Sequence, residues 1–212
     1  MPKVKKFDRE LVINQATDVF HDKGYNATSM QDLVDATGLN RSSIYNSFES
    51  KQNLFLECLA NYQNTYKNKM EKGLLKAENS LEAIDFIFDL YLQDILLDAK
   101  DKGCLMVNCK SEMANQDESI LRFLDKNQNF MTSFLEDVIA KGQKEQLINL
   151  KRTASEYALY LYTAIQGFRM TGILTNNKNV GGSDLTIAAY LNLNSLAPPL
   201  PRITVGFFST NS

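Results

Sequence analysis

The length, composition and charge of the chain limit the kinds of protein it can be. Its 212 residues include 44% hydrophobic and 23% charged side chains, and its formal net charge is -2. This is enough apolar material for one large or two small globular domains, and the composition is ordinary for a soluble protein. The charge argues against a protein that coats nucleic acid indiscriminately, although a local basic patch would still allow DNA binding.

Targeting signals and a disulfide pattern are both missing from the sequence. No run of about 18 apolar residues occurs and the start has no signal-peptide core, so we expect a cytoplasmic protein without a membrane partner. The cysteines, Cys58, Cys104 and Cys109, are odd in number and sparse, which favours reduced thiols over a disulfide framework.

A first helix is predicted over residues 8–24. A basic arm, residues 1–7, precedes it and would either lie along DNA phosphates or serve only as a solubilising terminus. His21 falls on the polar side of the helix, where we expect it to be solvated and unable to build a metal site. Gly24 is expected to end the helix. The apolar face, at helical spacing, consists of Val12, Ala16, Val19 and Phe20.

Residues 28–51 predict two short helices joined by a turn. Ser29 can cap the first helix, and Gly38 can end it in the left-handed conformation that a Cβ disfavours. Asn40 can cap the second helix. A helix, a glycine-containing turn and a helix form the helix-turn-helix plan.

The second short helix, residues 41–47, carries polar side chains on its outer side. Ile44 and Phe48, four residues apart, should face inward. Arg can bind guanine edges, Asn can pair with adenine, and Ser, Tyr and Lys supply phosphate contacts. A merely solvated helix face would have a similar composition, so the pattern alone leaves both interpretations open. The outward set is Arg41, Ser42, Ser43, Tyr45 and Asn46.

A long helix is predicted to connect this unit to the rest of the chain. Ser50 can cap it, and apolar residues recur at helical spacing toward Gly73.

The order G-Y-x-A-T-S-M-x-D-L-V-x-A-T-G-L-x-R-S-S-I-Y-N-S-F-x-S-K-x-x-L-F resembles the DNA-binding domain of the TetR family of bacterial transcriptional regulators. The resemblance implies a homodimer that places the second short helix of each subunit in the major groove of a palindromic operator. Ligand binding in the C-terminal domain would release the DNA, and repression is the family's common mode. We therefore expect an all-α fold of about nine helices. Its predicted parts are a helix-turn-helix domain (1–51), a helical regulatory and dimerisation domain (52–197) and a tail without an assigned role (198–212).

The resemblance also implies individual DNA contacts. Thr28 should bond a phosphate through its hydroxyl or the adjacent backbone N–H, and Lys51 should contact phosphate at the start of the fourth helix. Asn46 and Ser47 replace the tyrosine and histidine that are commoner in the family, so the operator sequence does not follow from a relative. The remaining positions, which face bases or the DNA backbone in this family, are Arg41, Ser42, Ser43 and Tyr45.

The rest of the chain has helical apolar periodicity over residues 80–99, 118–146, 155–174 and 183–196. The last two segments are more apolar than one core requires, and the resemblance suggests that they form an intersubunit four-helix bundle. Burial within the monomer is the alternative. The predicted dimer residues are Tyr157, Leu161, Phe168, Leu185 and Leu191.

A ligand pocket is expected between the helices of the larger domain, where apolar clefts with a few polar groups commonly hold small molecules. Ordinary packing is the alternative for each candidate, because aromatic residues at helical spacing usually serve cores. The candidates are Tyr91, Phe130, Phe134, Gln166 and Arg169.

Cys104 is a candidate sensing thiol. It lies in G-C-L-M-V-N, which resembles the G-C-L-x-V segment of a TetR branch that includes sensors of electrophiles and reactive chlorine. A position near a helix start favours the thiolate, and Lys100 and Lys102 would add to this effect. A buried thiol that only packs is the alternative.

Two other classes of function stay open at this point. A thiol-based redox enzyme would use Cys104, and a helical scaffold would not bind DNA. The sequence has no Gly-rich phosphate loop, nucleophile elbow or Ser/His/Asp set, so we expect neither enzyme activity nor a cofactor or metal. The expected partners are double-stranded operator DNA, a small-molecule or electrophile effector, and a second copy of the chain.

Overall fold

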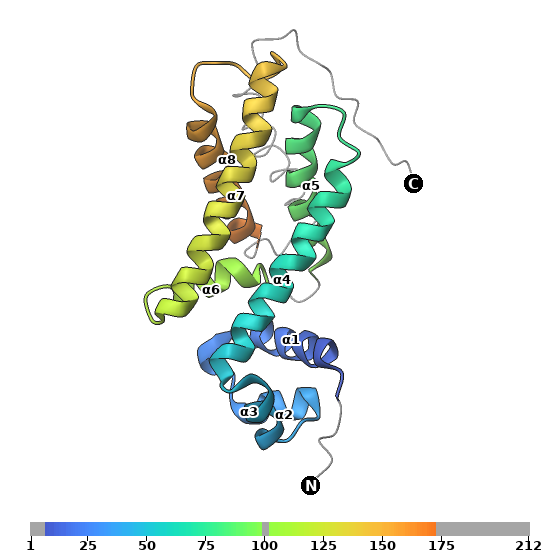
Figure 1. Ribbon diagram of the computed structural model, residues 1–212, viewed down its shortest axis with the longest axis vertical. Coiled ribbons are helices and arrows are strands. Elements are labelled where there is room, and N and C mark those ends of the chain that lie inside the picture. The colour runs from blue at the N-terminus through green and yellow to red at the C-terminus, as the bar shows by residue number, and fades with distance from the viewer. Residues whose placement is uncertain (1–6, 99–101, 173–212) are drawn as a thin grey trace.

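The computed structural model describes residues 7–98 and 102–172, and the regular elements within these ranges are all helices. Figure 1 shows a small unit of three helices from which α4 runs into a larger bundle formed by α5, α7 and α8, with α6 lying between α1 and the bundle. The predicted all-α fold class is confirmed. The helix predicted at 183–196 and the tail from 198 lie outside the described residues. The helices are α1 (Arg9–Ala27), α2 (Met30–Thr37), α3 (Arg41–Phe48), α4 (Lys51–Leu74), α5 (Ser80–Leu97), α6 (Leu105–Met113), α7 (Glu118–Lys144) and α8 (Ala154–Gly172).

Short polar side chains begin the helices of the small unit as predicted. Ser29 and Asp32 form a reciprocal capping box at the start of α2, and Gly38 ends that helix at a φ of 65°. Asn40 caps α3 and Ser50 caps α4, each by accepting a backbone N–H of the first turn.

Gly24 ends the first helical stretch of α1, as predicted. Its φ of 77° and ψ of 171° are not helical, and a second, short helical stretch continues beyond this kink to Ala27.

Two apolar cores divide the described residues. The lower core joins the inner sides of α1, α2, α3 and α6 with the first half of α4 and the start of α7, and it includes Ile44 and Phe48 as predicted. The upper core joins the second half of α4 with α5, α7 and α8. Helices α4 and α7 thus both belong to the two cores. Within the described ranges, no helix is both long and apolar enough to cross a membrane.

Candidate DNA-binding surface and helix-lined pocket

The outer side of α3 is a polar surface. Ile44 and Phe48 are 0% and 2% exposed, and their burial fixes which side of the short helix faces solvent. Tyr45 is 44% exposed on that side. The outward orientation predicted for the polar side chains of this helix is confirmed, while their contact with DNA stays a prediction. Arg41, Ser42 and Asn46 are also exposed, and Ser43 is half-buried.

Thr28 does not present a donor to this surface. Its side chain is 1% exposed, and its hydroxyl donates to the Gly24 carbonyl at 2.6 Å. The adjacent backbone N–H, that of Ser29, donates to the Asp32 carboxylate at 2.8 Å. The structure therefore contradicts the phosphate contact predicted for Thr28, because the kink at Gly24 offers its hydroxyl a partner within the chain.

Lys51 begins α4 at the edge of the polar surface. Its ammonium lies 4.4 Å from the centroid of the Tyr25 ring, which also stacks on Phe20. Partial burial lowers the pKa of Lys51. Its phosphate contact stays a prediction.

Arg9 makes its contacts within the protein, with α3 and α4, and is not a continuation of the basic arm. Its guanidinium lies 4.2 Å from the centroid of the Phe48 ring, donates to the Ser47 carbonyl at 3.1 Å and pairs with Glu57 at 2.5 Å. Residues 1–6 of the predicted arm lie outside the described residues.

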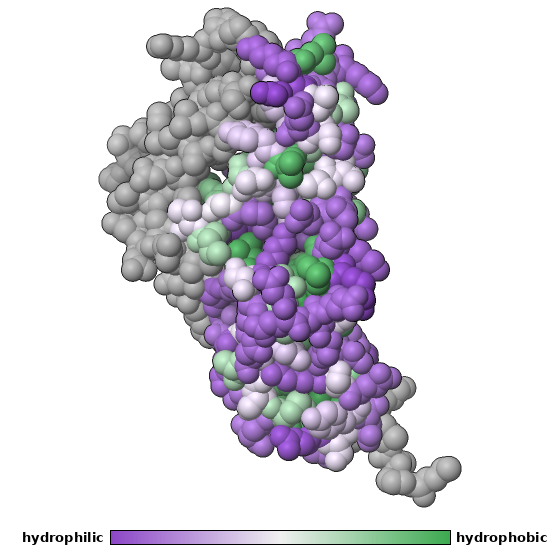
Figure 2. All heavy atoms as spheres, turned by 90° about the vertical axis from the view of Figure 1, so that its left-hand side faces the viewer, coloured by the Kyte–Doolittle hydropathy of each residue, from purple (hydrophilic) through white to green (hydrophobic). Residues whose placement is uncertain are grey.

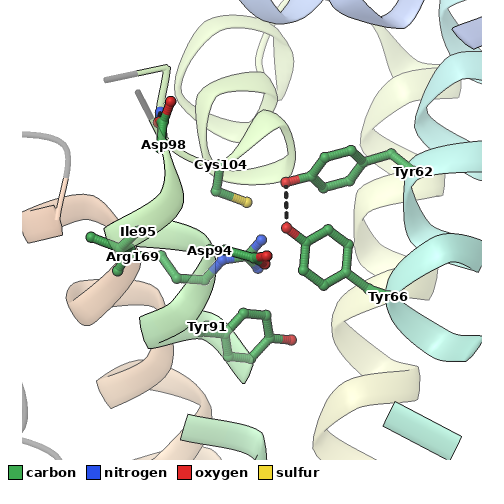
Figure 3. A pocket seen from close by; sticks show the side chains of 9 residues that line it. Tyr62, Tyr66, Tyr91, Asp94, Ile95, Asp98, Cys104 and Arg169 are labelled. Carbon is green, nitrogen blue, oxygen red and sulfur yellow. Dashed lines mark hydrogen bonds between the residues drawn. The ribbon is translucent and has the colours of Figure 1, made fainter. Parts of the chain in front are cut away.

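A cavity of about 30 Å³ lies between α4, α5, α6 and α8. Figure 3 shows Tyr62 and Tyr66 facing it from α4, with their hydroxyl groups joined by a hydrogen bond of 3.2 Å. Burial raises the pKa of both tyrosines, so they are neutral hydrogen-bonding groups at physiological pH. The lining residues are Tyr62, Tyr66, Tyr91, Asp94, Ile95, Asp98, Gly103, Cys104 and Arg169.

A second cavity, of about 40 Å³, continues from the first and shares Tyr62, Tyr66, Tyr91 and Arg169 with it. Its further walls combine the apolar side chains of Met70, Met106, Phe130, Met131 and Ile165 with Tyr162 and the polar side chains of Gln63, Lys67, Asn127 and Gln166. Of the predicted pocket residues, all but one line a cavity. The exception is Phe134, which packs against the upper core.

Arg169 is the charged centre of the first cavity. It is 9% exposed, and its guanidinium carbon lies 4.4 Å from the Tyr91 ring centroid and 5.6 Å from that of Tyr66. Burial alone would lower the pKa of Arg169, but neighbouring ionisable groups, Cys104 first among them, raise it. The guanidinium is therefore charged at neutral pH.

Cys104 precedes α6 and lines the first cavity. It is 5% exposed and its side chain makes no capping hydrogen bond. Lys102, predicted to support a thiolate there, instead forms an ion pair with Asp22 of α1; Lys100 lies outside the described residues. All three cysteines are free. Burial raises the pKa of the other two, Cys58 and Cys109, to about 12, which keeps them as thiols.

His21 connects α1 to the segment that precedes α6. Its Nε2 lies 2.9 Å from the Gly103 carbonyl, and its ring meets the edge of Tyr62. Because a carbonyl only accepts, we assign the ring proton to Nε2. Burial lowers the pKa of His21. The prediction that His21 is solvated is therefore wrong. Among residues 7–98 and 102–172, no three His, Cys, Asp or Glu side chains gather as a metal site.

Glu112 of α6 binds the backbone where α1 approaches α2. Its carboxylate accepts the N–H of Tyr25 at 2.9 Å and that of Asn26 at 2.7 Å, directly after the break at Gly24. Together with His21, this contact ties α6 and its preceding segment to the small unit.

The predicted dimer residues lie in the interior of the chain. Tyr157, Leu161 and Phe168 belong to the upper core, and Leu161 is 0% exposed. The prediction that they form an intersubunit surface is therefore wrong, because α5 and α7 already cover that side of α8. Leu185 and Leu191 lie outside the described residues.

A different side of α8 is exposed. Leu159 is 57% and Met170 45% exposed, and a Cβ at Gly167 would meet no atom within 4 Å. Figure 2 shows the side of the molecule toward α6 and α7, which is mainly hydrophilic with small, separate apolar areas.

Comparisons with known proteins agree with this architecture. Residues 12–58 match the family model described as bacterial regulatory proteins, tetR family. An uncharacterized HTH-type transcriptional regulator of Bacillus subtilis (strain 168), YezE, is 32% identical over 143 residues, which make up 67% of this chain and 71% of YezE. The HTH-type transcriptional repressor ComR of Escherichia coli (strain K12) is 28% identical over 168 residues, covering 79% of this chain and 80% of ComR.

A solved structure shows the same fold. The TetR family transcriptional regulator CifR, as a cysteine mutant complexed with a 26-base-pair double-strand operator DNA, matches with a TM-score of 0.77 and 21% identity, covering 90% of this chain and 98% of CifR.

Proposed function

Because this chain belongs to the TetR family of bacterial regulatory proteins, we propose that it is a transcriptional repressor that binds a palindromic operator as a homodimer and leaves it when an effector occupies the helix-lined pocket. The exposed polar side of α3 is the observation that carries this proposal. The name of ComR as a repressor supports repression, and the CifR complex supports operator DNA as the partner.

The DNA contacts follow from the chemistry of the exposed side chains. Arg41 supplies a guanidinium fork for a guanine edge, Asn46 an amide for adenine, and Tyr45 a ring and hydroxyl for base methyls and backbone. Ser42, Ser43 and Lys51 supply phosphate contacts that fix the register of the helix on the duplex. Thr28 is no longer in this set, since its hydroxyl is buried.

The homodimer is proposed to form through the exposed side of α8. Leu159 and Met170 lie there as large apolar side chains in contact with solvent. Two copies related by a two-fold axis would present two α3 helices, as a palindromic site requires.

Release is proposed to pass through α4 and α6. Both helices contribute to the pocket, through Tyr62 and Tyr66 and through Cys104 and Met106. Both also contact the DNA-binding unit, α4 through the lower core and α6 through Glu112. An effector that moves either helix therefore changes the position of α3.

A thiol response is a second candidate, because Cys104 is the cysteine that lines the cavity. N-ethylmaleimide is a suitable probe. The Cys104 thiolate sulfur adds to one carbon of the maleimide double bond, and the adjacent carbon takes a proton from water. Loss of operator binding after this reaction, absent in Cys104→Ser, supports the thiol response. Equal release of Cys104→Ser rejects it.

The test of the main proposal is retardation of the DNA fragment upstream of the protein's own gene. We expect specific binding that weakens steeply as salt rises, because phosphate contacts release counterions. Affinity for this fragment no greater than for unrelated DNA of equal length would reject the proposal.

A further inference from the structure

Arg169 carries donors that the protein leaves unused. Within the part of the chain that the structure describes, its guanidinium contacts only the aromatic rings of Tyr66 and Tyr91 and has no hydrogen bond or ion pair. Contact with ring faces leaves the in-plane N–H groups available, and their fork geometry matches the two oxygens of a carboxylate. A charged donor group this deeply buried normally has a partner.

Asp94 has an unused hydrogen-bond acceptor in the same cavity. Its Oδ2 is the one buried side-chain nitrogen or oxygen without a hydrogen bond of ordinary geometry among the described residues, although the carboxylate interacts with the nearby Tyr66 hydroxyl and helps to raise the pKa of Tyr66. Its other oxygen, Oδ1, lies 3.5 Å from the Lys69 ammonium. Figure 3 shows the Asp94 carboxylate and the Arg169 guanidinium projecting toward the same space. A ligand that satisfies both groups must bring an acceptor for Arg169 and a donor for Asp94.

Charged side chains of both signs surround the two cavities. Arg169 and Lys67 line them together with the carboxylates of Asp94 and Asp98, the latter accepting the Gly103 N–H at 2.7 Å. Lys69, 3.5 Å from Asp94, and Lys110, which donates to the Tyr162 hydroxyl at 2.6 Å, add two cations behind this lining. The cations therefore outnumber the carboxylates, which suits a bound monocarboxylate.

The second cavity accommodates the remainder of such a ligand. It begins at Arg169 and is walled by Met70, Met106 and Met131, whose flexible side chains can repack around an apolar group. At about 40 Å³ it is smaller than a benzene-sized cavity of roughly 150 Å³, so entry of a ring requires this repacking.

We propose that Arg169 and Asp94 are the head-group site of the effector pocket, and that the effector is a small organic acid with a hydroxyl or amino donor beside its carboxylate and an apolar body. This inference rests on the proposed function, because it names the class of effector that occupies the same pocket. Arg169 binds the carboxylate, Asp94 accepts the donor, and the methionine-walled cavity holds the body.

Calorimetric titration of the full chain, without DNA, tests this inference with three matched probes. Mandelate carries a carboxylate, a hydroxyl and a phenyl ring; phenylacetate lacks the hydroxyl, and 1-phenyl-1,2-ethanediol lacks the charge. We expect mandelate to bind about 10-fold more tightly than phenylacetate and at least about 100-fold more tightly than the diol.

Two variants assign the binding to the named residues. Arg169→Met keeps the contact with the rings and should weaken mandelate binding at least about 100-fold, and Asp94→Leu should remove the preference for mandelate over phenylacetate. Arg122→Met and Asp125→Leu, at exposed positions of α7, are the matched controls and should leave both affinities unchanged. If Arg169→Met fails to fold, Arg169→Lys keeps the charge without the fork and should still weaken binding about 10-fold.

The inference is overturned if mandelate shows no binding at about 10 mM, or if the diol binds as tightly as mandelate. It is also overturned if mandelate binds Arg169→Met as tightly as the unmodified chain. Intact operator binding in the retardation assay would then show that only the effector assignment had failed, whereas loss of specific operator binding would reject the proposed function itself.

Discussion

At the level of single residues, Arg41 and Tyr45 provide the clearest test of operator recognition. Both side chains are exposed on α3, so Arg41→Ala and Tyr45→Ala should leave the melting temperature unchanged. Each should weaken binding to the protein's own promoter fragment by about 10- to 100-fold, as expected for the loss of a base contact worth roughly 1–3 kcal/mol. Retardation titrations measure the effect.

The matched control for this prediction is Arg122→Ala, which removes an exposed arginine from α7. It should bind the fragment as the unmodified chain does. Equal losses in Arg122→Ala and Arg41→Ala would mean that net charge, and not the α3 surface, governs binding.

His21 predicts how stability depends on pH near neutrality. It is the only histidine of the 212 residues, and burial holds its pKa below the ordinary value of 6.5 in the folded state. Below pH 6.5 the unfolded chain takes up a proton that the folded chain does not, so the stabilisation present above that pH is lost as the pH falls. Urea midpoints measured between pH 7.5 and 5.5 should therefore decrease.

The variant His21→Gln separates this effect from other titrations. It should have a lower midpoint at pH 7.5, because the Gly103 contact is weakened, and a smaller decrease between pH 7.5 and 5.5. Parallel pH profiles of the variant and the unmodified chain would contradict the assignment to His21.

At the level of helices, α6 is the element that joins the pocket to the DNA-binding unit. Glu112→Ala leaves the N–H groups of Tyr25 and Asn26 without their carboxylate partner. We expect a loss of about 1–3 kcal/mol in the free energy of unfolding, measured by urea denaturation, since bonds to a charged acceptor are lost. Operator affinity should also change, because the position of α2 and α3 relative to α6 is no longer fixed.

The control for this prediction is Glu136→Ala, at an exposed position of α7, which should change neither quantity. If Glu112→Ala and Glu136→Ala have the same free energy of unfolding, the Glu112 contact does not hold α6 and the DNA-binding unit together.

Local sequence was sufficient to predict most helices and their ends. Ser29, Asn40 and Ser50 cap the helices they were expected to cap, because a cap depends on backbone groups within three residues. A helix start near Cys104 was expected, but the extent of α6 was not predicted, since its short run from Leu105 is too brief for apolar periodicity to be distinguished.

The errors concern contacts between residues distant in sequence. His21 is covered by Gly103, 82 positions later, and no local pattern encodes that contact. Leu161 was expected at a subunit interface and lies in the core, because apolar periodicity shows that a side is buried without showing what covers it. Tyr62 and Tyr66 follow the helical spacing of the apolar residues of α4, but their role in lining the pocket depends on α5 and α8.

At the level of the whole molecule, the exposed side of α8 predicts the oligomeric state. Leu159→Arg and Met170→Arg place a charge on the proposed dimer surface, where it would be buried without a partner on association. Sedimentation at micromolar concentration should show a dimer for the unmodified chain and a monomer for the double variant. The monomer should also bind the operator more weakly, since it engages one half-site at a time.

Leu121→Arg is the control for this prediction, because Leu121 is 46% exposed on α7 and is not part of the proposed surface of α8. It should remain dimeric. A dimeric Leu159→Arg/Met170→Arg variant, or a monomeric unmodified chain, would contradict the proposed arrangement.

The continuity of α4 has a thermodynamic consequence for the response of the promoter. Its first turns pack in the lower core, and its middle turns place Tyr62 and Tyr66 in the pocket. If the ligand lowers operator affinity through this helix, linkage requires the operator to lower ligand affinity by the same factor. On the proposed function, the operator-bound chain therefore responds only at a higher effector concentration than the free chain. Titrations on the protein alone would then underestimate the concentration at which repression is relieved.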